Sequence, residues 1–223
     1  MVISYNSPRI SNPLHSLRRQ SSPPKEIILV EAGKSILRDS EHWKVILDPQ
    51  GSQSHSRNIG AKAATGDIIA FLDSDCVAPQ SWIARIQNRF ELGEKAIGGP
   101  YVPGQNTEFA KEAHDFITHS FGKMSATFSG INRPQEYVKT VSGGNCAFDR
   151  AAFEKACGFD ERQHWREEPE LCRKIREGGA KILFDPELWV WHWWKGWDGL
   201  LPLAKQGYFY GRIRVKSQRE IER

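Results

Sequence analysis

The chain has 223 residues, 26% of them charged and 11% aromatic, and carries a formal net charge of +4. These values indicate a globular domain with a full core, exclude a largely disordered chain, and are too weakly basic to indicate a nucleic-acid-binding protein. The four cysteines form no Cys-x-x-Cys pair, so a structural zinc site is not expected. No stretch is typical of a signal peptide or a membrane span, and we expect a cytoplasmic protein.

Strand and helix signals alternate over the first hundred residues. Val2-Ile3 predicts the end of a first strand. Asn12-Pro13 predicts a short helix that is capped by Asn12 and has Pro13 at its first position. Buried strands are expected at 26–30, 43–47 and 68–72, and helices at 54–64 and 82–90. The alternation predicts an α/β fold with a mostly parallel central sheet flanked by helices. Because a central strand usually needs about five residues, we expect the natural chain to begin upstream of Met1.

The second half of the chain is less regular. Residues 101–138 give weak signals around one expected helix at 108–121, and long irregular segments of this kind are often binding loops. Further on, strands are expected at 146–148, 181–184 and 188–191, and helices from Arg150 and over 169–177. We therefore expect one domain at 1–223, with a regular α/β half at 1–100, a less regular half at 101–198, and a basic amphipathic helix at 199–223.

Two carboxylates, Asp73 and Asp75, directly follow the apolar run 68–72. Ligands of parallel sheets bind beyond the carboxyl ends of the strands, and side chains two apart on an extended chain project to the same side. The pair can therefore converge on one hard cation that bridges phosphate oxygens. The alternative is a turn in which aspartate simply ends the strand.

Several segments together resemble the motifs of glycosyltransferase family 2, in that order and at suitable intervals. They are Ser56-Arg57-Asn58-Ile59-Gly60, residues 66–75, Ser142-Gly143-Gly144-Asn145, Gly158-Phe159-Asp160, Glu167-Glu168-Pro169-Glu170-Leu171 and Trp191-His192. The resemblance covers nearly the whole chain. It implies a GT-A fold, in which residues 1–100 would form the nucleotide-sugar-binding half and residues 101–198 the acceptor and catalytic half. It also implies an enzyme that transfers a sugar, with inversion, from a nucleotide diphosphate donor to an acceptor hydroxyl.

The same resemblance implies a metal-dependent donor site. Asp75 would hold Mg²⁺ or Mn²⁺ against the diphosphate, and Asp73 would contact the ribose or a water molecule on the ion. His192 would be a further metal ligand or a phosphate contact, although a single histidine after a strand is often structural. Arg57 would bind the nucleotide or its phosphates as a permanent, forked cation; the alternative is a surface cation on a helix.

The catalytic base implied by the resemblance is Glu168, which occupies the position where relatives usually have aspartate. It would take the proton of the acceptor hydroxyl, unless the acids at 167–170 only complement the positive end of a helix. Gly143 and Gly144 would let the backbone approach the donor sugar, or would form an ordinary turn. Asn145 would donate hydrogen bonds to the sugar or the diphosphate.

Two regions depart from the family pattern or extend it. Where relatives carry two aspartates near the nucleotide base, this chain has Glu31-Ala32-Gly33-Lys34, so Glu31 is the remaining acid and a uridine base is not assumed. Tryptophans and other apolar residues alternate with cations from Trp189 to Lys216. This pattern fits core packing or peripheral contact with the inner face of a membrane, and a glycan or lipid-linked acceptor.

Two other classes of protein fit part of the sequence. Asp73-Ser74-Asp75-Cys76-Val77 also matches the nucleophile motif of haloacid dehalogenase-like phosphatases, although that motif usually follows the first strand. Ala32 and Glu168, which depart from the family pattern, also fit a catalytically impaired module that binds nucleotide sugars or carbohydrates.

Overall fold

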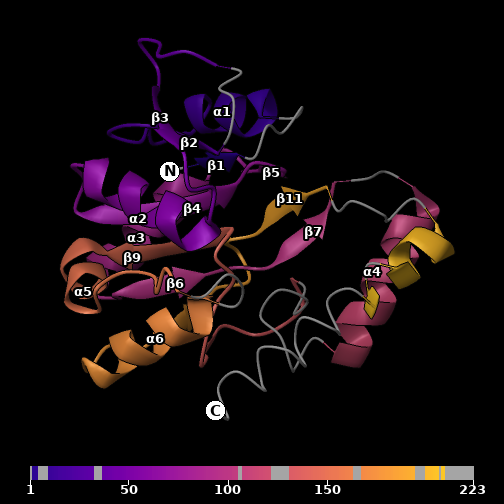
Figure 1. The fold of residues 1–223 in the computed structure, drawn as a ribbon. Helices are drawn as coiled ribbons and strands as arrows, with labels where there is room; N and C mark the ends of the chain where they lie inside the picture. Colours follow the sequence, from indigo (N-terminus) through magenta and orange to yellow (C-terminus); the bar gives the residue numbers. More distant parts are fainter. Residues whose placement is uncertain are drawn as a thin grey trace.

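The computed structural model describes residues 2–4, 10–32, 37–104, 107–121, 131–162, 167–193, 199–205 and 207–208. An eight-stranded sheet forms its centre, in the order β3-β2-β1-β4-β9-β6-β10-β8. A smaller sheet, in the order β5-β11-β7, leads from this centre towards helix α4 (Glu108–Phe121) (Figure 1).

The N-terminal part of the large sheet is parallel. It consists of β3 (Lys44–Asp48), β2 (Ile28–Ala32), β1 (Val2–Ser4) and β4 (Ile68–Asp73). All five residues of β2 are buried, as expected for a strand covered on both faces. The carboxyl ends of these four strands therefore form one edge, and Asp73 lies on it.

The remaining strands make the sheet mixed, which corrects the expectation of a mostly parallel sheet. Strand β9 (Asn145–Asp149) pairs antiparallel with both β4 and β6 (Ala96–Gly98). β10 (Leu183–Phe184) then pairs parallel with β6 and antiparallel with β8 (Glu136–Tyr137). The chain reaches β9 after the long segment that follows β6, and β9 runs opposite to both of its neighbours. The predicted α/β class is confirmed.

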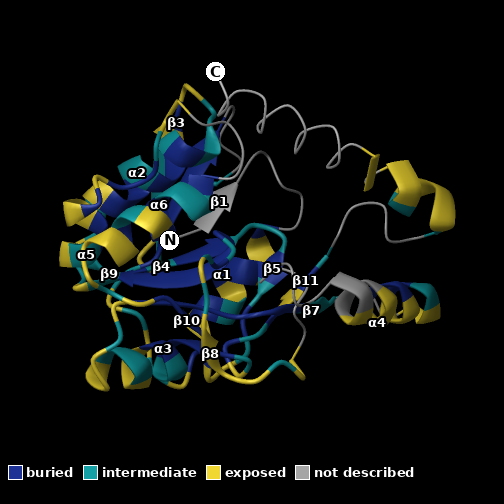
Figure 2. Ribbon diagram, turned by 90° about the horizontal axis from the view of Figure 1, so that it is seen from below, coloured by how far each residue is buried: buried dark blue, intermediate teal, exposed yellow. Residues whose placement is uncertain are grey.

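The helices cover both faces of the sheet, as the alternation along β4 shows. Ile69 and Phe71 belong to one buried cluster with residues of α2 (Gln53–Ala63), α5 (Arg150–Lys155) and α6 (Glu167–Glu177). Leu72 and the half-buried Ile68 belong to the other, with α1 (Ser11–Arg18) and α3 (Trp82–Glu91). Figure 2 shows the buried strands of the centre between helices that expose their outer sides.

The small sheet joins segments that are far apart in the sequence. Strand β11 (Val190–His192) pairs antiparallel with β5 (Cys76–Val77) and parallel with β7 (Tyr101–Pro103). In this register His192 lies opposite Cys76, directly after the Asp73-Ser74-Asp75 segment. The small sheet thus brings the C-terminal histidine to the end of β4.

Element boundaries shift by only a few residues from those predicted. α1 begins at Ser11, after Ile10, which makes no side-chain capping bond, so the predicted cap at Asn12 is wrong. α6 begins at Glu167, two residues before its predicted start. The prediction for 108–121 matches α4. Strands β5, β6 and β7, of two or three residues each, were too short to predict from periodicity.

The expected C-terminal helix is described only in part. Residues 200–205 and 207–208 are helical, and Leu200, Leu201 and Tyr208 are exposed. Most of its predicted cations, from Arg212 onward, lie outside the described residues. Within the described ranges, no helix combines the length and apolar character needed to cross a bilayer.

Candidate functional site

Predicted site residues from separate strands meet at the carboxyl edge of the parallel sheet. Asp73 ends β4 and lies level with Ile3 of β1, while Glu31 of β2 lies level with Ser4. Glu31 is fully buried, and one of its oxygens accepts a long hydrogen bond of 3.5 Å from the backbone N–H of Leu37. The two acids thus flank β1 at the edge where ligands of such sheets bind.

Arg57 is the cation at the centre of this edge. Its side chain is buried, and its Nη2 lies 3.4 Å from Asp73 Oδ1. Nη1 is bonded to the carboxylate of Glu167 and lies 3.8 Å from Glu168 Oε1. Although burial opposes its charge, Asp73, Glu168 and Glu167 raise the pKa of Arg57, so the guanidinium remains a cation. It connects the end of β4 to the start of α6.

Local contacts in α2 and around it explain why Arg57 points inward. Ser52 caps the helix by accepting a hydrogen bond from the backbone N–H of His55 at 3.1 Å. Asp48, at the end of β3, accepts hydrogen bonds from the backbone N–H of Gln50 and the hydroxyl of Ser56. Asn58, which follows Arg57, both donates a hydrogen bond to the backbone of Phe159 and accepts one from it. The helix is therefore fixed on both sides of Arg57.

The two adjacent glutamates of α6 differ in exposure. The Glu167 side chain is 1% exposed and the Glu168 side chain 20% exposed. Burial and the neighbouring Glu168 carboxylate raise the pKa of Glu167, against the opposing effect of Arg57. Glu168 Oε1 accepts a hydrogen bond of 3.0 Å from the backbone N–H of Gly143. Only Glu168 of the pair retains a surface that a substrate can reach.

The Gly143-Gly144 turn passes so close to these side chains that a larger residue would require the loop or the side chains to shift. A Cβ on Gly143 would lie 2.5 Å from Glu168 Oε1, and one on Gly144 would lie 2.0 Å from Asp73 Oδ2. The carbonyl of Gly144 also accepts a hydrogen bond of 3.1 Å from the backbone N–H of Asp73. The glycines therefore allow the loop to lie against the acids, whereas the sequence predicted an approach to the donor sugar.

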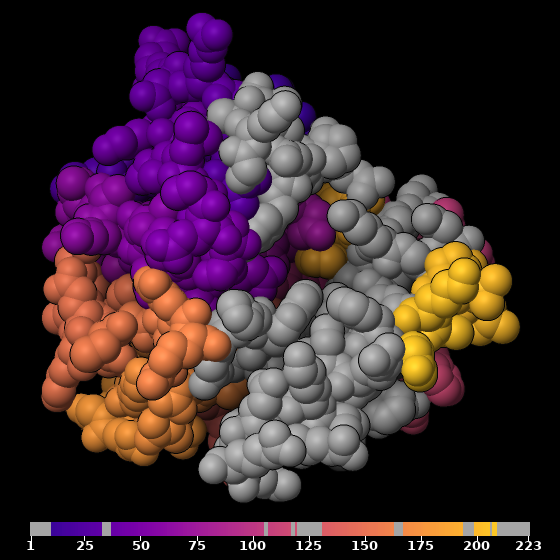
Figure 3. All heavy atoms as spheres, viewed as in Figure 1, coloured from indigo at the N-terminus to yellow at the C-terminus, as the bar shows by residue number. Residues whose placement is uncertain are grey.

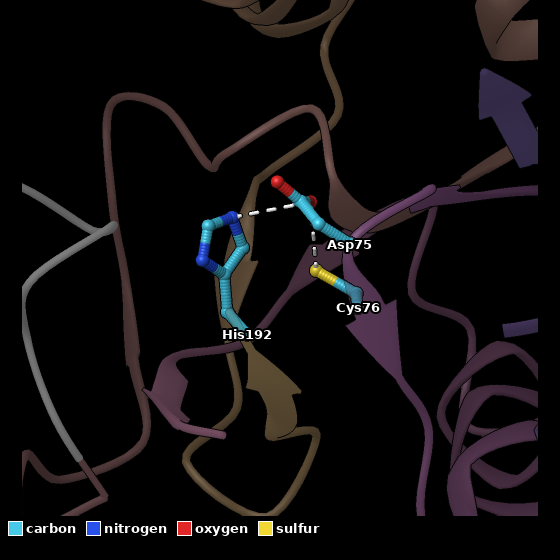
Figure 4. A group of neighbouring side chains, drawn as sticks. All are labelled: Asp75, Cys76 and His192. Carbon is cyan, nitrogen blue, oxygen red and sulfur yellow. Dashed lines mark hydrogen bonds and ion pairs between the residues drawn. The ribbon is translucent and has the colours of Figure 1, made fainter. Parts of the chain in front are cut away.

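A second group of side chains lies next to this cluster, at the start of the small sheet. Asp75, Cys76 and His192 place one possible ligand atom each within 4.8 Å of one another, and His192 Nε2 lies 3.3 Å from Asp75 Oδ1 (Figure 4). The backbone N–H of Trp193 donates to the carbonyl of Asp75 at 3.0 Å, which joins the end of β11 to this segment. In the space-filling view the purple N-terminal segments adjoin the orange segments that contain α5 and α6 (Figure 3).

The chemistry of this second group fits a divalent cation. Burial lowers the pKa of His192 to about 4, so the imidazole is neutral near pH 7 and has a lone pair for a metal. A carboxylate oxygen and an imidazole nitrogen suit Mn²⁺ or a similar ion. Burial, with Asp73 and Asp75, raises the pKa of the Cys76 thiol well above its usual value, so the thiol stays protonated and is a poor ligand.

Asn145 is buried in the interior of the fold, where its amide contacts other parts of the chain. Its side chain is fully buried, accepts a hydrogen bond of 2.9 Å from Trp82 Nε1, and donates to the carbonyls of Pro100 and Leu188. These protein contacts occupy the amide. Asn145 thus connects three parts of the fold, and its hydrogen bonds to the sugar or diphosphate stay a prediction.

The family model of glycosyl transferase family 2 matches residues 1–157. The chain belongs to this family. The predicted family is confirmed, and the alternative of a haloacid dehalogenase-like phosphatase is excluded.

Curated relatives of this family-2 chain carry the names of glycosyltransferases. It is 25% identical over 214 residues to a glucosyl-dolichyl phosphate glucuronosyltransferase of Haloferax volcanii, and the match covers 86% of this chain and 67% of that protein. It is 30% identical over 142 residues to a pre-mycofactocin glycosyltransferase of Mycobacterium tuberculosis, covering 61% of this chain and 29% of that one. The chain thus spans under a third of the mycobacterial relative.

Solved structures confirm the GT-A fold for this member of family 2. GalNAc-T7 with UDP, GalNAc and Mn²⁺ has a TM-score of 0.62 at 18% identity, covering 86% of this chain and 43% of that one. S. aureus TarS 1–349 in complex with UDP-GlcNAc gives 0.63 at 16% identity, covering 91% and 59%.

One feature of the site, the role of Glu167, was not apparent in the sequence. The family motif indicated an acidic pair, but it did not indicate that the first acid would bond to Arg57, 110 positions earlier in the chain. The sequence did contain a signal that this part of the site is crowded. Gly143 and Gly144 are adjacent glycines, which mark a place where other groups approach the backbone closely.

Proposed function

We propose that this protein is a metal-dependent, inverting glycosyltransferase that uses a nucleoside diphosphate sugar and an acceptor hydroxyl. The observation that carries the proposal is the convergence of Asp73, from the end of β4, and Glu168, from the start of α6, around Arg57. This arrangement places a partly exposed carboxylate next to the sheet edge where a nucleotide binds in folds of this type.

Each group has a chemical role in this proposal. Glu168, oriented by the Gly143 N–H, takes the proton of the acceptor hydroxyl as its oxygen attacks the anomeric carbon. The bond from that carbon to the diphosphate breaks, and the nucleoside diphosphate leaves. Asp75 and His192 are the residues that would hold Mg²⁺ or Mn²⁺, with Asp73 beside them. A bound divalent ion would offset the charge that grows on the departing diphosphate.

The donor that we propose is a uridine diphosphate sugar, with Glu31 near the base or ribose. UDP or UDP-GlcNAc is named for the GalNAc-T7 and TarS structures, which supports testing uridine first. Because this chain has Glu31-Ala32 where relatives carry two aspartates near the base, other bases are tested as well. A panel of UDP-, GDP- and dTDP-sugars, each with Mn²⁺, Mg²⁺ or EDTA, measures nucleotide release and separates base, sugar and metal requirements.

The decisive variant is Glu168→Gln, which keeps the shape of the side chain and removes the base. We expect nucleotide release and transfer to fall by about 10²- to 10⁴-fold. UDP–Mn²⁺ affinity, measured by calorimetry, should stay within about threefold, because Gln accepts the same Gly143 hydrogen bond. Full activity in this variant would contradict the proposed base. A wild-type protein that binds UDP–Mn²⁺ but turns over no donor would favour the alternative of an impaired binding module.

The acceptor that we propose is a glycan or a lipid-linked molecule at a membrane surface. Leu200 and Leu201 are 74% and 67% exposed at the start of the C-terminal helical segment, and such residues insert into the interfacial layer of a bilayer. The name of the archaeal relative includes a dolichyl phosphate. Sedimentation with anionic vesicles tests this contact, and Leu200→Ser/Leu201→Ser should weaken it. Failure to sediment at both low and high salt would contradict it.

A further inference from the structure

Glu167 is a buried acid of the site to which the proposed reaction gives no task. Its side chain is 1% exposed, so it cannot meet an acceptor or a donor directly. Burying a carboxylate is unfavourable unless a partner compensates it, and here the partner is Nη1 of Arg57. The position of this acid therefore has to be explained by what it does to Arg57.

Arg57 is held by several groups at once. Nη2 lies 3.4 Å from Asp73 Oδ1, and the guanidinium carbon lies 5.4 Å from the centre of the Phe159 ring. Nη1 is bonded to Glu167, while Glu168 Oε1 stays 3.8 Å away. Glu168 is thus a carboxylate within reach of Nη1 if Glu167 loses its charge.

Glu168 occupies a different contact in the native arrangement. Its Oε1 accepts a hydrogen bond of 3.0 Å from the Gly143 N–H, which keeps the side chain at the partly exposed surface. A close ion pair with Arg57 would draw the carboxylate inward from that contact. Displacements of about 1 Å at a reacting group can cost roughly 100-fold in rate.

We infer that Glu167 is a positioning residue: by engaging Nη1 of Arg57, it keeps the Glu168 carboxylate on the Gly143 N–H and open to the acceptor. The catalytic consequence rests on the proposed function, in which Glu168 is the base. The geometric statement does not, because it concerns only the place of Glu168 relative to Arg57 and Gly143.

The test is Glu167→Gln, a variant of the same shape that lacks the charge. Its crystal structure should show Glu168 Oε1 closer to Arg57 Nη1 than 3.8 Å and its 3.0 Å hydrogen bond to Gly143 lost. kcat for transfer should fall by about 100-fold. The Kd for UDP with Mn²⁺ should change by less than about threefold, since the donor contacts remain. Glu167→Asp, which keeps the charge, should recover most of the lost kcat.

A matched control is Asp185→Asn, which also neutralises a buried carboxylate bonded to arginine. Asp185 accepts hydrogen bonds from Arg85 Nε at 2.7 Å and Nη2 at 3.1 Å, between α3 and the end of β10. This variant should lower the melting temperature and leave kcat unchanged. An equal fall in kcat in both variants would overturn the inference, because it would reflect a general loss of structure.

Other results would also overturn the inference. One is a crystal structure of Glu167→Gln in which Glu168 still accepts the hydrogen bond from the Gly143 N–H. Another is a Glu167→Gln variant that loses much of its affinity for UDP–Mn²⁺ while its kcat is unchanged. If Glu167→Gln does not fold, Arg57→Gln/Glu167→Gln removes both members of the buried Arg57–Glu167 pair and carries the test. In this double variant Glu168 should still accept the hydrogen bond from the Gly143 N–H, because no guanidinium is present to attract it. Loss of that hydrogen bond would refute the inference that Arg57 draws Glu168 away. A wild type inactive with every donor would defeat the proposed function alone, because the crystal structures still decide the position of Glu168.

Discussion

Asp73 and Asp75 are separated by one residue, yet they belong to two regions with different surroundings. Asp73 belongs to an inner cluster with Arg57, Glu167 and Glu168, in which a protein cation connects the acids. Asp75 belongs to an outer group with Cys76 and His192, at the start of the small sheet. The segment that directly follows the apolar run 68–72 thus contributes one carboxylate to each region.

The difference indicates a division of tasks between the regions. Carboxylates that share a buried guanidinium have a defined position, which suits orientation of a base. A carboxylate beside a neutral imidazole offers ligands to a cation that comes with the substrate. Inner variants should therefore alter turnover, and outer variants should alter the metal requirement.

The largest effect is expected from Gly144→Ala, which disrupts the inner cluster directly. The added Cβ would lie 2.0 Å from Asp73 Oδ2 and 2.6 Å from the Tyr101 hydroxyl, so either the loop or Asp73 must move. We expect transfer to fall by about 100-fold or more. The control is Gly66→Ala, whose Cβ would meet its nearest atom at an ordinary 3.5 Å. Activity of Gly144→Ala within tenfold of wild type would contradict this account of the turn.

Asp75→Asn should separate the outer group from the inner one. Loss of the anionic ligand should raise the Mn²⁺ concentration that gives half-maximal activity by about tenfold or more. Glu168→Gln, by comparison, should lower the maximal rate and leave that concentration unchanged. Titration of both variants with Mn²⁺ measures the difference. An unchanged metal requirement in Asp75→Asn would remove Asp75 from the proposed ligands.

Asn145→Ala should lower stability, because the Asn145 side chain links the large sheet to the small one. Asn145 begins β9 of the large sheet, and its amide donates to the carbonyls of Pro100 and Leu188, close to the starts of β7 and β11. Removing it also leaves Trp82 Nε1 without its 2.9 Å acceptor. We expect a loss of about 3 kcal/mol in the free energy of unfolding, measured in urea. If the variant is as stable as the wild type but binds UDP–Mn²⁺ more weakly, the result would support the predicted contact of Asn145 with the donor.

Residues of the two regions differed in how far sequence could predict them. Asp73 and Asp75 follow a long apolar run, so their place at the sheet edge follows from local pattern. His192 reaches Asp75 through strands of two or three residues, which are stabilised by partners distant in the sequence. The strand predicted at 188–191 corresponds to β11, but periodicity could not predict its partners β5 and β7.

Arg57 and Asn145 show a second limit of sequence reasoning. Both are polar residues in family motifs, and such residues were expected to face the ligand. In the structure both side chains are buried and paired, and their partners, which include Glu167, Trp82 and backbone carbonyls, lie far along the chain. Motifs predicted which residues gather at the site, but they did not predict which of them contact one another.

The smallest effect is expected from Ser52→Ala, which removes the cap of the helix that carries Arg57. The Ser52 hydroxyl accepts a hydrogen bond of 3.1 Å from the His55 N–H, so its loss should cost about 1 kcal/mol of stability in urea. Ser81→Ala is the matched control, because Ser81 precedes α3 without a side-chain capping bond. Since Asp48 still holds the first turn of α2, kcat should stay within about twofold. A larger fall in kcat would mean that the inner cluster depends on the cap as well as on the charges around Arg57.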